Sequence, residues 1–224
     1  MRVNIAPHHP GETDWQRIRD RLSRGGEALG LTLSADQHAR LISFLDLLAR
    51  WNQAYNLTAV RDPLEMVARH LLDSLSVHPF LFGEQVLDIG TGAGLPGLPL
   101  AILSPERHFR LLDGNGKKIR FVRQAVLELG LGNVEPVQAR IETYRPAAKF
   151  STIVSRAVAA ADILSIPHTE LLARPGRLLL MKGRQSEPDG MPDNSGLSSS
   201  AFSVHRLHVP FLDEPRHLIE IRSD

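Results

Sequence analysis

The sequence predicts an α/β protein with a mostly parallel sheet of seven strands and an N-terminal helical extension. Three observations lead to this class. From Val86 onward, short apolar segments alternate with helical ones, which indicates crossover units and a parallel sheet. The segment VLDIGTGAGLPGLPLAIL, residues 86–103, passes from an apolar strand through a glycine-rich turn into a helix. Two later segments, FSVHRLHVPF and RHLIEIR, alternate like the strands of a closing antiparallel hairpin.

The chain divides into two predicted parts, a helical extension over residues 1–80 and the sheet domain over residues 81–224. The five parallel strands are predicted at Val86–Ile89, Phe109–Asp113, Val134–Ala139, Thr152–Ser155 and Leu178–Lys182. The helices between them are predicted at Pro99–Leu103, Gly116–Leu129 and Ala160–Ala173. Residues 184–200, rich in Pro, Gly and Ser, are predicted to form a long loop.

The extension is predicted to be helical from its apolar spacing and its capping residues. One helix is expected over residues 14–29. A clearer one begins after Ser34, which forms a capping box with Gln37. Another begins after Asp62, with Glu65 completing a second box.

The composition is that of an ordinary globular chain of 224 residues, 42% hydrophobic and 23% charged. The net charge of +1 means that any basic surface for nucleic acid is local. The chain has no cysteine, which excludes disulfides and thiolate nucleophiles and fits a reducing, cytoplasmic location. We expect no metal cofactor, because no cluster of metal ligands stands out. We expect no membrane partner, because no apolar run is long enough to span a bilayer.

Four glycines, Gly90, Gly92, Gly94 and Gly97, lie where the first strand turns into a helix. Residues without a Cβ atom let the backbone turn sharply and let a ligand approach it closely. The last three also satisfy the G-x-G-x-x-G pattern of nucleotide-binding loops, which is a weak match when taken alone.

Two acids flank this loop and indicate the class of nucleotide. Asp88 lies at the end of the first strand, where a pyrophosphate would meet a carboxylate, whereas the cationic S-adenosylmethionine suits an acid at the lip of the loop. Asp113 ends the next strand, about 20 residues after the loop, where an acid usually binds a ribose hydroxyl pair. NAD uses the same ribose contact, so Asp113 supports a nucleoside without choosing between the two cofactors.

A set of motifs in order resembles a known family: WNQAYNLTAVRDPLEMVARHLLDSL, VLDIGTGAGLPGLPLAI, LLDGNGKKIRFVRQA, NVEPVQARIE, VSRAVA and LLLMKG. Together, from about Leu33 to Gly183, they resemble the bacterial 16S (small-subunit) ribosomal RNA guanine-N7 methyltransferases, also called the glucose-inhibited division protein B family. The resemblance implies a Rossmann-like class I fold that transfers a methyl group from S-adenosyl-L-methionine and releases S-adenosyl-L-homocysteine. It also implies a monomer that acts on ribosomal RNA or on the 30S particle.

The resemblance carries the family's cofactor contacts onto Gly90, Leu95, Ile141, Glu142 and Arg156. Asp113 matches the ribose-binding acid, and Asp88, Gly92 and Gly94 complete the expected cofactor site. The chain departs from the family at Gly114, where Ser is usual, in the loop that replaces the helix after MKG, and in a longer N-terminal stretch. The absence of this helix affects the expected packing of one sheet face more than the expected chemistry.

Basic residues begin directly after the ribose acid, in the segment GKKIRFVR. The candidate RNA contacts are Lys117, Lys118, Arg120, Arg123 and Arg184. A solvated helix face is the plain alternative for such a run. Its closeness to Asp113 favours contacts with RNA phosphates beside the methyl donor.

No catalytic residue is assigned from the sequence. Guanine N7 has a free lone pair and carries no proton, so methyl transfer needs positioning and electrostatics rather than a general base. The substrate-side candidates are Arg156, His70 and Lys182. A lone histidine on an apolar helix is more often a packing residue, whereas Arg156 follows a strand at the edge where ligands bind in such folds.

Other functions stay open on the residues alone. The same fold serves methyltransferases that act on another RNA, on a protein or on a small molecule. An NAD-dependent oxidoreductase would share the glycine loop and the ribose acid. A nucleic-acid-binding module without activity would bind no S-adenosylmethionine.

Overall fold

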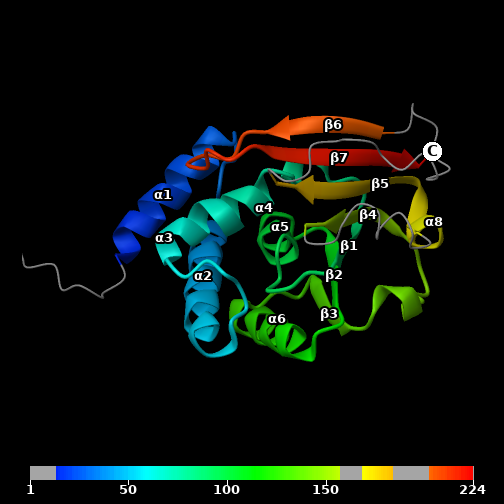
Figure 1. The fold of residues 1–224 in the computed structure, drawn as a ribbon, viewed down its shortest axis with the longest axis horizontal. Coiled ribbons are helices and arrows are strands. Elements are labelled where there is room, and N and C mark those ends of the chain that lie inside the picture. Colours follow the sequence, from blue (N-terminus) through cyan, green and yellow to red (C-terminus); the bar gives the residue numbers. More distant parts are fainter. Residues whose placement is uncertain (1–13, 157–167, 184–201, 224) are drawn as a thin grey trace, which may run out of the picture.

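The computed structural model describes residues 14–156, 168–183 and 202–223. Its centre is a seven-stranded sheet in the order β3-β2-β1-β4-β5-β7-β6 (Figure 1). The strands are β1 (Gln85–Ile89), β2 (His108–Asp113), β3 (Val134–Gln138), β4 (Phe150–Ser155), β5 (Leu172–Lys182), β6 (Phe202–Leu207) and β7 (Arg216–Ser223). β1 to β5 are parallel, and β7 pairs antiparallel with β5 and β6. The predicted fold class, five parallel strands and closing hairpin are confirmed.

Both faces of the sheet are buried because apolar residues occupy successive positions along the inner strands. In β1, Val86 belongs to one apolar cluster, whereas Leu87 and Ile89 belong to a second one. In β2, Leu111 and Leu112 divide in the same way. Successive side chains of a strand point to opposite faces, so each cluster lies on its own side of the sheet.

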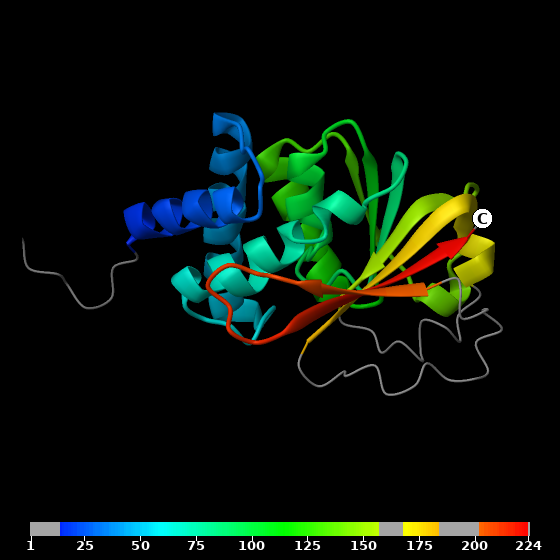
Figure 2. The same ribbon diagram turned by 90° about the horizontal axis from the view of Figure 1, so that it is seen from above.

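The described helices flank the sheet and form the extension at one end of it (Figure 2). They are α1 (Trp15–Ala28), α2 (Ala35–Tyr55), α3 (Pro63–Met66), the π-helical turn η1 (Val67–Leu72), α4 (Asp73–Leu75), α5 (Gly97–Leu103), α6 (Gly116–Leu129) and α8 (His168–Leu171), with 3₁₀ turns η2 (His78–Phe80) and η3 (Ile141–Thr143). The predicted helix over 14–29, the capping box of Ser34 and Gln37 and the helix Gly116–Leu129 are confirmed. None of the described helices combines the length and apolar character that a membrane crossing requires.

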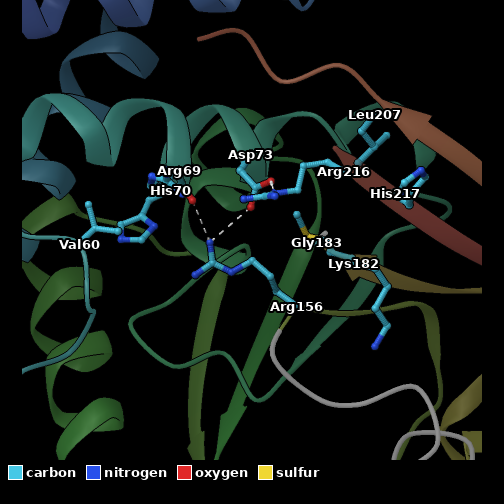
Figure 3. Close-up of a pocket in the computed structure, with 11 residues that line it drawn as sticks. Val60, Arg69, His70, Asp73, Arg156, Lys182, Gly183, Leu207, Arg216 and His217 are labelled. Atoms are coloured by element: carbon cyan, nitrogen blue, oxygen red, sulfur yellow. Dashed lines mark hydrogen bonds and ion pairs between the residues drawn. The ribbon is translucent and has the colours of Figure 1, made fainter. Parts of the chain in front are cut away.

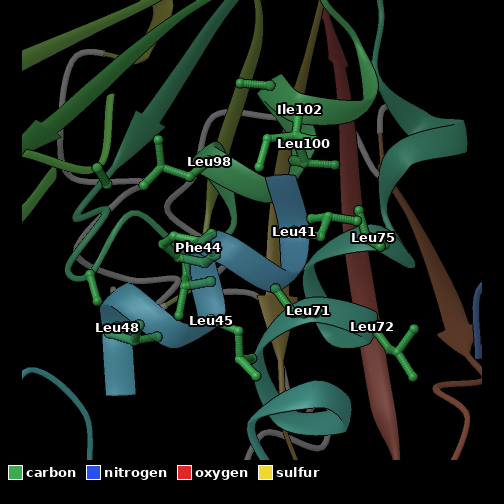
Figure 4. Packing of buried hydrophobic residues seen from close by; sticks show 14 of the residues in the cluster. Leu41, Phe44, Leu45, Leu48, Leu71, Leu72, Leu75, Leu98, Leu100 and Ile102 are labelled. Carbon is green, nitrogen blue, oxygen red and sulfur yellow. The ribbon is translucent and has the colours of Figure 1, made fainter. Parts of the chain in front are cut away.

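The extension packs directly on the sheet domain through α2. Figure 4 shows Leu41, Phe44 and Leu45 of α2 facing the helix of residues 67–75 and α5. On the other side, the ring centroids of Phe44 and Trp51 lie 6.3 and 5.5 Å from that of Phe121 in α6. One apolar cluster therefore joins the extension to the sheet.

The third helix of the extension differs from its prediction. The Asp62 carboxylate accepts from Leu64 N at 2.9 Å, so it caps the helix without the expected box with Glu65. The helix then widens into the π turn, in which Asp73 N donates to Ala68 O five residues back. Single π turns often occur at functional sites, and the side chains of this one line the cavity described below.

The predicted helix Ala160–Ala173 is wrong at its end, because Leu172 and Ala173 already belong to β5 and Leu172 pairs with Phe150 of β4. Most of its length falls in residues 157–167, outside the described residues. The predicted loop over 184–200, with Arg184, also lies outside them.

Candidate active site

The glycine loop follows β1 and folds back onto the end of β2. Gly90, Gly92 and Gly94 have φ angles of 69°, 59° and 79°, which glycine adopts without strain. Gly90 N and Thr91 N both donate to Leu112 O, at 2.8 and 3.0 Å. The loop backbone is thereby fixed beside the neighbouring strand.

Close packing explains the last glycine of the loop. A Cβ atom on Gly97 would overlap the side chain of Leu111 and lie 2.7 Å from Asp88 Oδ2. Only a residue without a side chain lets α5 start this close to the sheet, which is the packing role of the third glycine in nucleotide-binding loops.

Asp88 lies beneath the loop and not at its lip, which corrects the expected placement. Its side chain is fully buried, and Oδ2 accepts from the Thr91 hydroxyl at 2.7 Å and from Gly97 N at 2.8 Å. Burial raises the pKa of Asp88 to about 6 against these two hydrogen bonds. Its geometry is that of a residue that shapes the loop.

Asp113 ties the loop to α6. Its Oδ2 accepts from Gly92 N at 2.9 Å, and its Oδ1 accepts from Asn115 N at 2.8 Å. Lys118 Nζ lies 3.9 Å from Oδ2, and the side chain of Asp113 is 12% exposed. The carboxylate is thus already oriented at the carboxyl edge of the sheet.

The space above the loop fits a nucleoside. A Cβ atom on Gly92 would meet nothing closer than 3.9 Å, where Lys118 Nζ and Gly90 O lie. An open backbone face beside an oriented carboxylate suits a flat ligand with a ribose. At Gly114 a Cβ atom would lie an ordinary 3.4 Å from Arg140 Cγ, so the family's usual Ser would also fit.

The remaining predicted cofactor residues lie at the same edge but in different settings. Leu95 lies within the glycine loop and is buried. Ile141 and Glu142 open η3, which follows β3 after Ala139 and Arg140, and Glu142 is exposed. Arg156 directly follows β4, the strand next to β1.

A cavity of about 280 Å³ lies at this edge, beside Arg156 (Figure 3). Its lining comes from the extension, from the ends of β4, β5 and β6 and from the start of β7: Val60, Arg69, His70, Asp73, Arg156, Met181, Lys182, Gly183, Leu207, Arg216 and His217. Arg156, His70 and Lys182, the three substrate-side candidates, are therefore brought together in one cavity.

Asp73 joins three of these segments. Its side chain is 5% exposed, with Arg216 Nε at 3.1 Å and Arg156 Nη1 at 3.6 Å (Figure 3). Arg156 Nη1 also donates to Arg69 O at 3.3 Å. Burial raises the pKa of Asp73, and the two guanidinium groups oppose the rise. The acid holds the extension, β4 and β7 around the cavity.

His70 is a neutral group in this cavity. Its Nε2 lies 2.8 Å from Thr58 Oγ1, and Nδ1 has no hydrogen-bond partner among the described residues. Burial, and then the charge of Arg156, lower its pKa to about 4. His70 is therefore a poor proton acceptor at neutral pH.

The predicted basic residues Lys117, Lys118, Arg120 and Arg123 lie on α6 and do not line the cavity. All but the half-buried Lys118 are exposed. Within the described chain, no group of three or more His, Asp or Glu side chains is placed to hold a metal ion.

Sequence reasoning missed Arg69, Asp73 and Arg216 as cavity residues. The sequence context of Asp73 could have indicated a buried acid, because this residue lies among leucines in HLLDSL. A charge at a buried helical position needs a partner. Nothing in the sequence indicates that the partner is Arg216, on the last strand of the sheet.

Comparison with known proteins decides the family. Residues 37–219 match the GidB family model, described as rRNA small subunit methyltransferase G. The chain belongs to this family. It is 51% identical over 201 residues to ribosomal RNA small subunit methyltransferase G of Methylococcus capsulatus, covering 90% of this chain and 97% of that protein. It is 47% identical over 199 residues to the protein of the same name from Yersinia enterocolitica, covering 88% and 95%.

A solved structure is also similar, a SAM dependent methyltransferase from Aquifex aeolicus, with 19% identity and a TM-score of 0.49 over 69% of this chain and 91% of that one. The predicted family, the enzyme class and S-adenosylmethionine as cofactor are confirmed by the family match and the relatives.

Proposed function

We propose that the protein transfers the methyl group of S-adenosylmethionine to N7 of a guanine in 16S ribosomal RNA. One observation carries the proposal: the open glycine loop and the arginine-lined cavity lie on neighbouring strands at one edge of the sheet. Arg156 connects them, because its charge acts on Asp88 beneath the loop and on His70 and Asp73 at the cavity.

The cofactor side binds through backbone and carboxylate groups. When bound, S-adenosylmethionine supplies an electrophilic methyl group on a sulfonium. Gly92 leaves room for close approach, and Asp113 is oriented to accept hydrogen bonds from ribose hydroxyls. Asp88 keeps the loop in shape through Thr91 and Gly97.

The substrate side positions a base without removing a proton. Guanine N7 attacks through its own lone pair, so the low pKa of His70 is compatible with the reaction. Transfer moves the positive charge from sulfur to the base and leaves the net charge of the site unchanged. Arg156, Lys182 and His70 would therefore act by holding the base in line, which is a matter of geometry and fixed electrostatics.

The RNA backbone would meet the basic face of α6. Lys117, Lys118, Arg120 and Arg123 begin directly after Asp113, and cations there suit phosphates next to the methyl donor. Arg184 extends this proposal beyond the described residues. We also propose that the protein acts as a monomer in the cytoplasm, on RNA or on the assembled subunit.

The test is transfer of a tritiated methyl group to small ribosomal subunits from a strain that lacks the enzyme, followed by nucleoside analysis. We expect the label on guanine N7. Label on a base carbon, on a ribose oxygen or on protein would reject the proposal. A thermal shift with NADH and none with S-adenosylhomocysteine would favour the oxidoreductase alternative instead.

A further inference from the structure

The loop between β6 and β7 presents an aromatic side chain in an unusual backbone conformation. Phe211 is 42% exposed and has a φ angle of 65°. A bulky residue is rarely found at positive φ, and such strain is often retained where the side chain has a function. An exposed phenylalanine on a turn contributes little to the core, so its position calls for a partner.

Two arginines of α1 are placed against this ring. The guanidinium carbon of Arg21 lies 4.6 Å from the ring centroid, and that of Arg24 lies 5.7 Å from it. Figures 1 and 2 both show the loop beside α1. A cation over an aromatic ring is an attractive contact, and the exposed part of the ring stays open for a further stacking partner.

A cavity of about 350 Å³ borders the ring and is lined by charges of both signs. Glu214 is paired with Arg69 at 2.8 Å, whereas Glu65 and Asp213 add negative charge. Carboxylates repel a phosphate but accept hydrogen bonds from the amino and imino groups of a nucleobase. The cavity therefore suits a base edge, and the exposed Arg24 outside it suits the attached phosphate.

This cavity adjoins the proposed substrate cavity. Arg69 lines both, and its carbonyl oxygen accepts from Arg156 at 3.3 Å. A nucleotide on Phe211 would thus lie one side chain away from a base held beside Arg156. The two cavities share Arg69 as a common wall, so one RNA strand could occupy both.

We propose that Phe211, Arg21 and Arg24 form a subsite that stacks an unpaired RNA base next to the target guanine. The inference rests on the proposed function, because it names a second contact with the same RNA. Stacking of unpaired bases on aromatic and guanidinium planes is how proteins commonly recognise RNA loops.

The test compares Phe211→Gly with Phe211→Trp in methyl transfer to small subunits. Glycine removes the ring and suits the positive φ, so the fold is retained; tryptophan keeps a stacking surface. We expect Phe211→Gly to raise KM for the subunit roughly tenfold, within the range known for one stacked base. kcat and the affinity for S-adenosylhomocysteine should stay within about twofold, and Phe211→Trp should keep the KM of the wild type. The exposed Val204 of β6, which lines neither cavity, provides the control variant Val204→Ala.

A photoreactive phenylalanine at position 211, with one at position 204 as control, tests the contact independently of turnover. Crosslinking of position 211 to 16S RNA beside the methylated guanine supports the subsite. Crosslinking to a ribosomal protein, or an unchanged KM in Phe211→Gly, would overturn the subsite. In that case, normal methylation by the wild type would still support the proposed function. Absence of methylation by the wild type would instead reject the proposed function, and a crosslink from position 211 to any part of 16S RNA would then still show that this loop contacts RNA.

Discussion

The two halves of the candidate active site are built in different ways. The glycine-loop side comes from one continuous stretch, β1 to the end of β2, and is held by hydrogen bonds that Asp88 and Asp113 accept from the Thr91 hydroxyl, Gly92 N and Gly97 N. The substrate cavity comes from separate segments joined by ion pairs of Asp73. The first half is a local motif, and the second exists only when distant parts of the chain have come together.

The largest expected effect comes from a substitution that disrupts the substrate cavity. Asp73→Ala leaves Arg156 and Arg216 close together without their shared carboxylate, and breaking a buried ion pair costs about 3–5 kcal/mol. Urea unfolding should show this loss of free energy of unfolding. The control is Asp36→Ala, which removes an exposed pair with Arg40 and should change stability by about 0.5 kcal/mol or less. Equal effects of the two substitutions would contradict the central role of Asp73.

Asp88 and His70, one group from each half, should respond to pH with opposite signs. The pKa of Asp88 is raised to about 6 in the folded protein, so its contribution to stability is present below about pH 4 and lost as the pH rises to about 6. The pKa of His70 is lowered to about 4, so its contribution is present above about pH 6.5 and lost as the pH falls toward 4. Each shift corresponds to about 3 kcal/mol.

Comparing the wild type with Asp88→Asn and with His70→Gln by urea unfolding from pH 4 to 7 isolates each group. Relative to the variant, the wild type should become less stable with rising pH in the first comparison and more stable in the second. The charge of Arg156 affects the pKa of both groups, Arg69 also affects His70, and Asp113 also affects Asp88. Because salt screens these charges, the buffer and the salt concentration must be kept constant. Slopes of the same sign would contradict the opposite pKa shifts of Asp88 and His70.

A smaller effect is expected on cofactor binding by the glycine-loop side. Asp113→Ala should weaken binding of S-adenosylhomocysteine by about 2 kcal/mol, because a charge-assisted hydrogen bond and the anchor of Gly92 are both lost. Calorimetry measures the affinity, and the melting temperature checks the fold. Unchanged affinity with a collapsed melting temperature would make Asp113 a structural residue alone.

The smallest expected effect is on RNA binding by the basic residues of α6. Replacing Lys117 and Lys118 by Ala should reduce the log–log salt dependence of RNA binding by about 1–2, one unit for each lost phosphate contact. Affinity for S-adenosylhomocysteine should stay within a few-fold. An unchanged salt slope would remove these lysines from the RNA interface.

The arrangement of the local half could be predicted from the sequence and that of the assembled half could not, for the same physical reason. The positions of Gly92 and Asp113 could be predicted because a strand, a tight turn and a strand-end acid follow one another along the sequence, whereas their contacts with the cofactor stay a prediction. The placement of Asp88 beneath the loop was missed, because a strand-end acid looks the same in sequence whether it points to a ligand or to Gly97 N.

The cavity could not be predicted as a unit. His70 and Arg156 were singled out separately, but their meeting depends on the π turn and on the pairing of β7 with β5. Helical periodicity does not reveal a single π turn, because one widened turn changes the register of only a few residues. The pairing of Asp73 with Arg216 depends on the complete sheet.

The position of Arg216 on β7 also sets an order of events during synthesis. A chain leaves the ribosome N-terminus first, so the residues of the glycine loop emerge long before the arginine that completes the anchor of Asp73. A chain interrupted before β7 would already contain the methyl-donor motif but would lack one wall of the cavity. On the proposed function, such an interrupted chain would lack a complete substrate cavity and would not modify a ribosome.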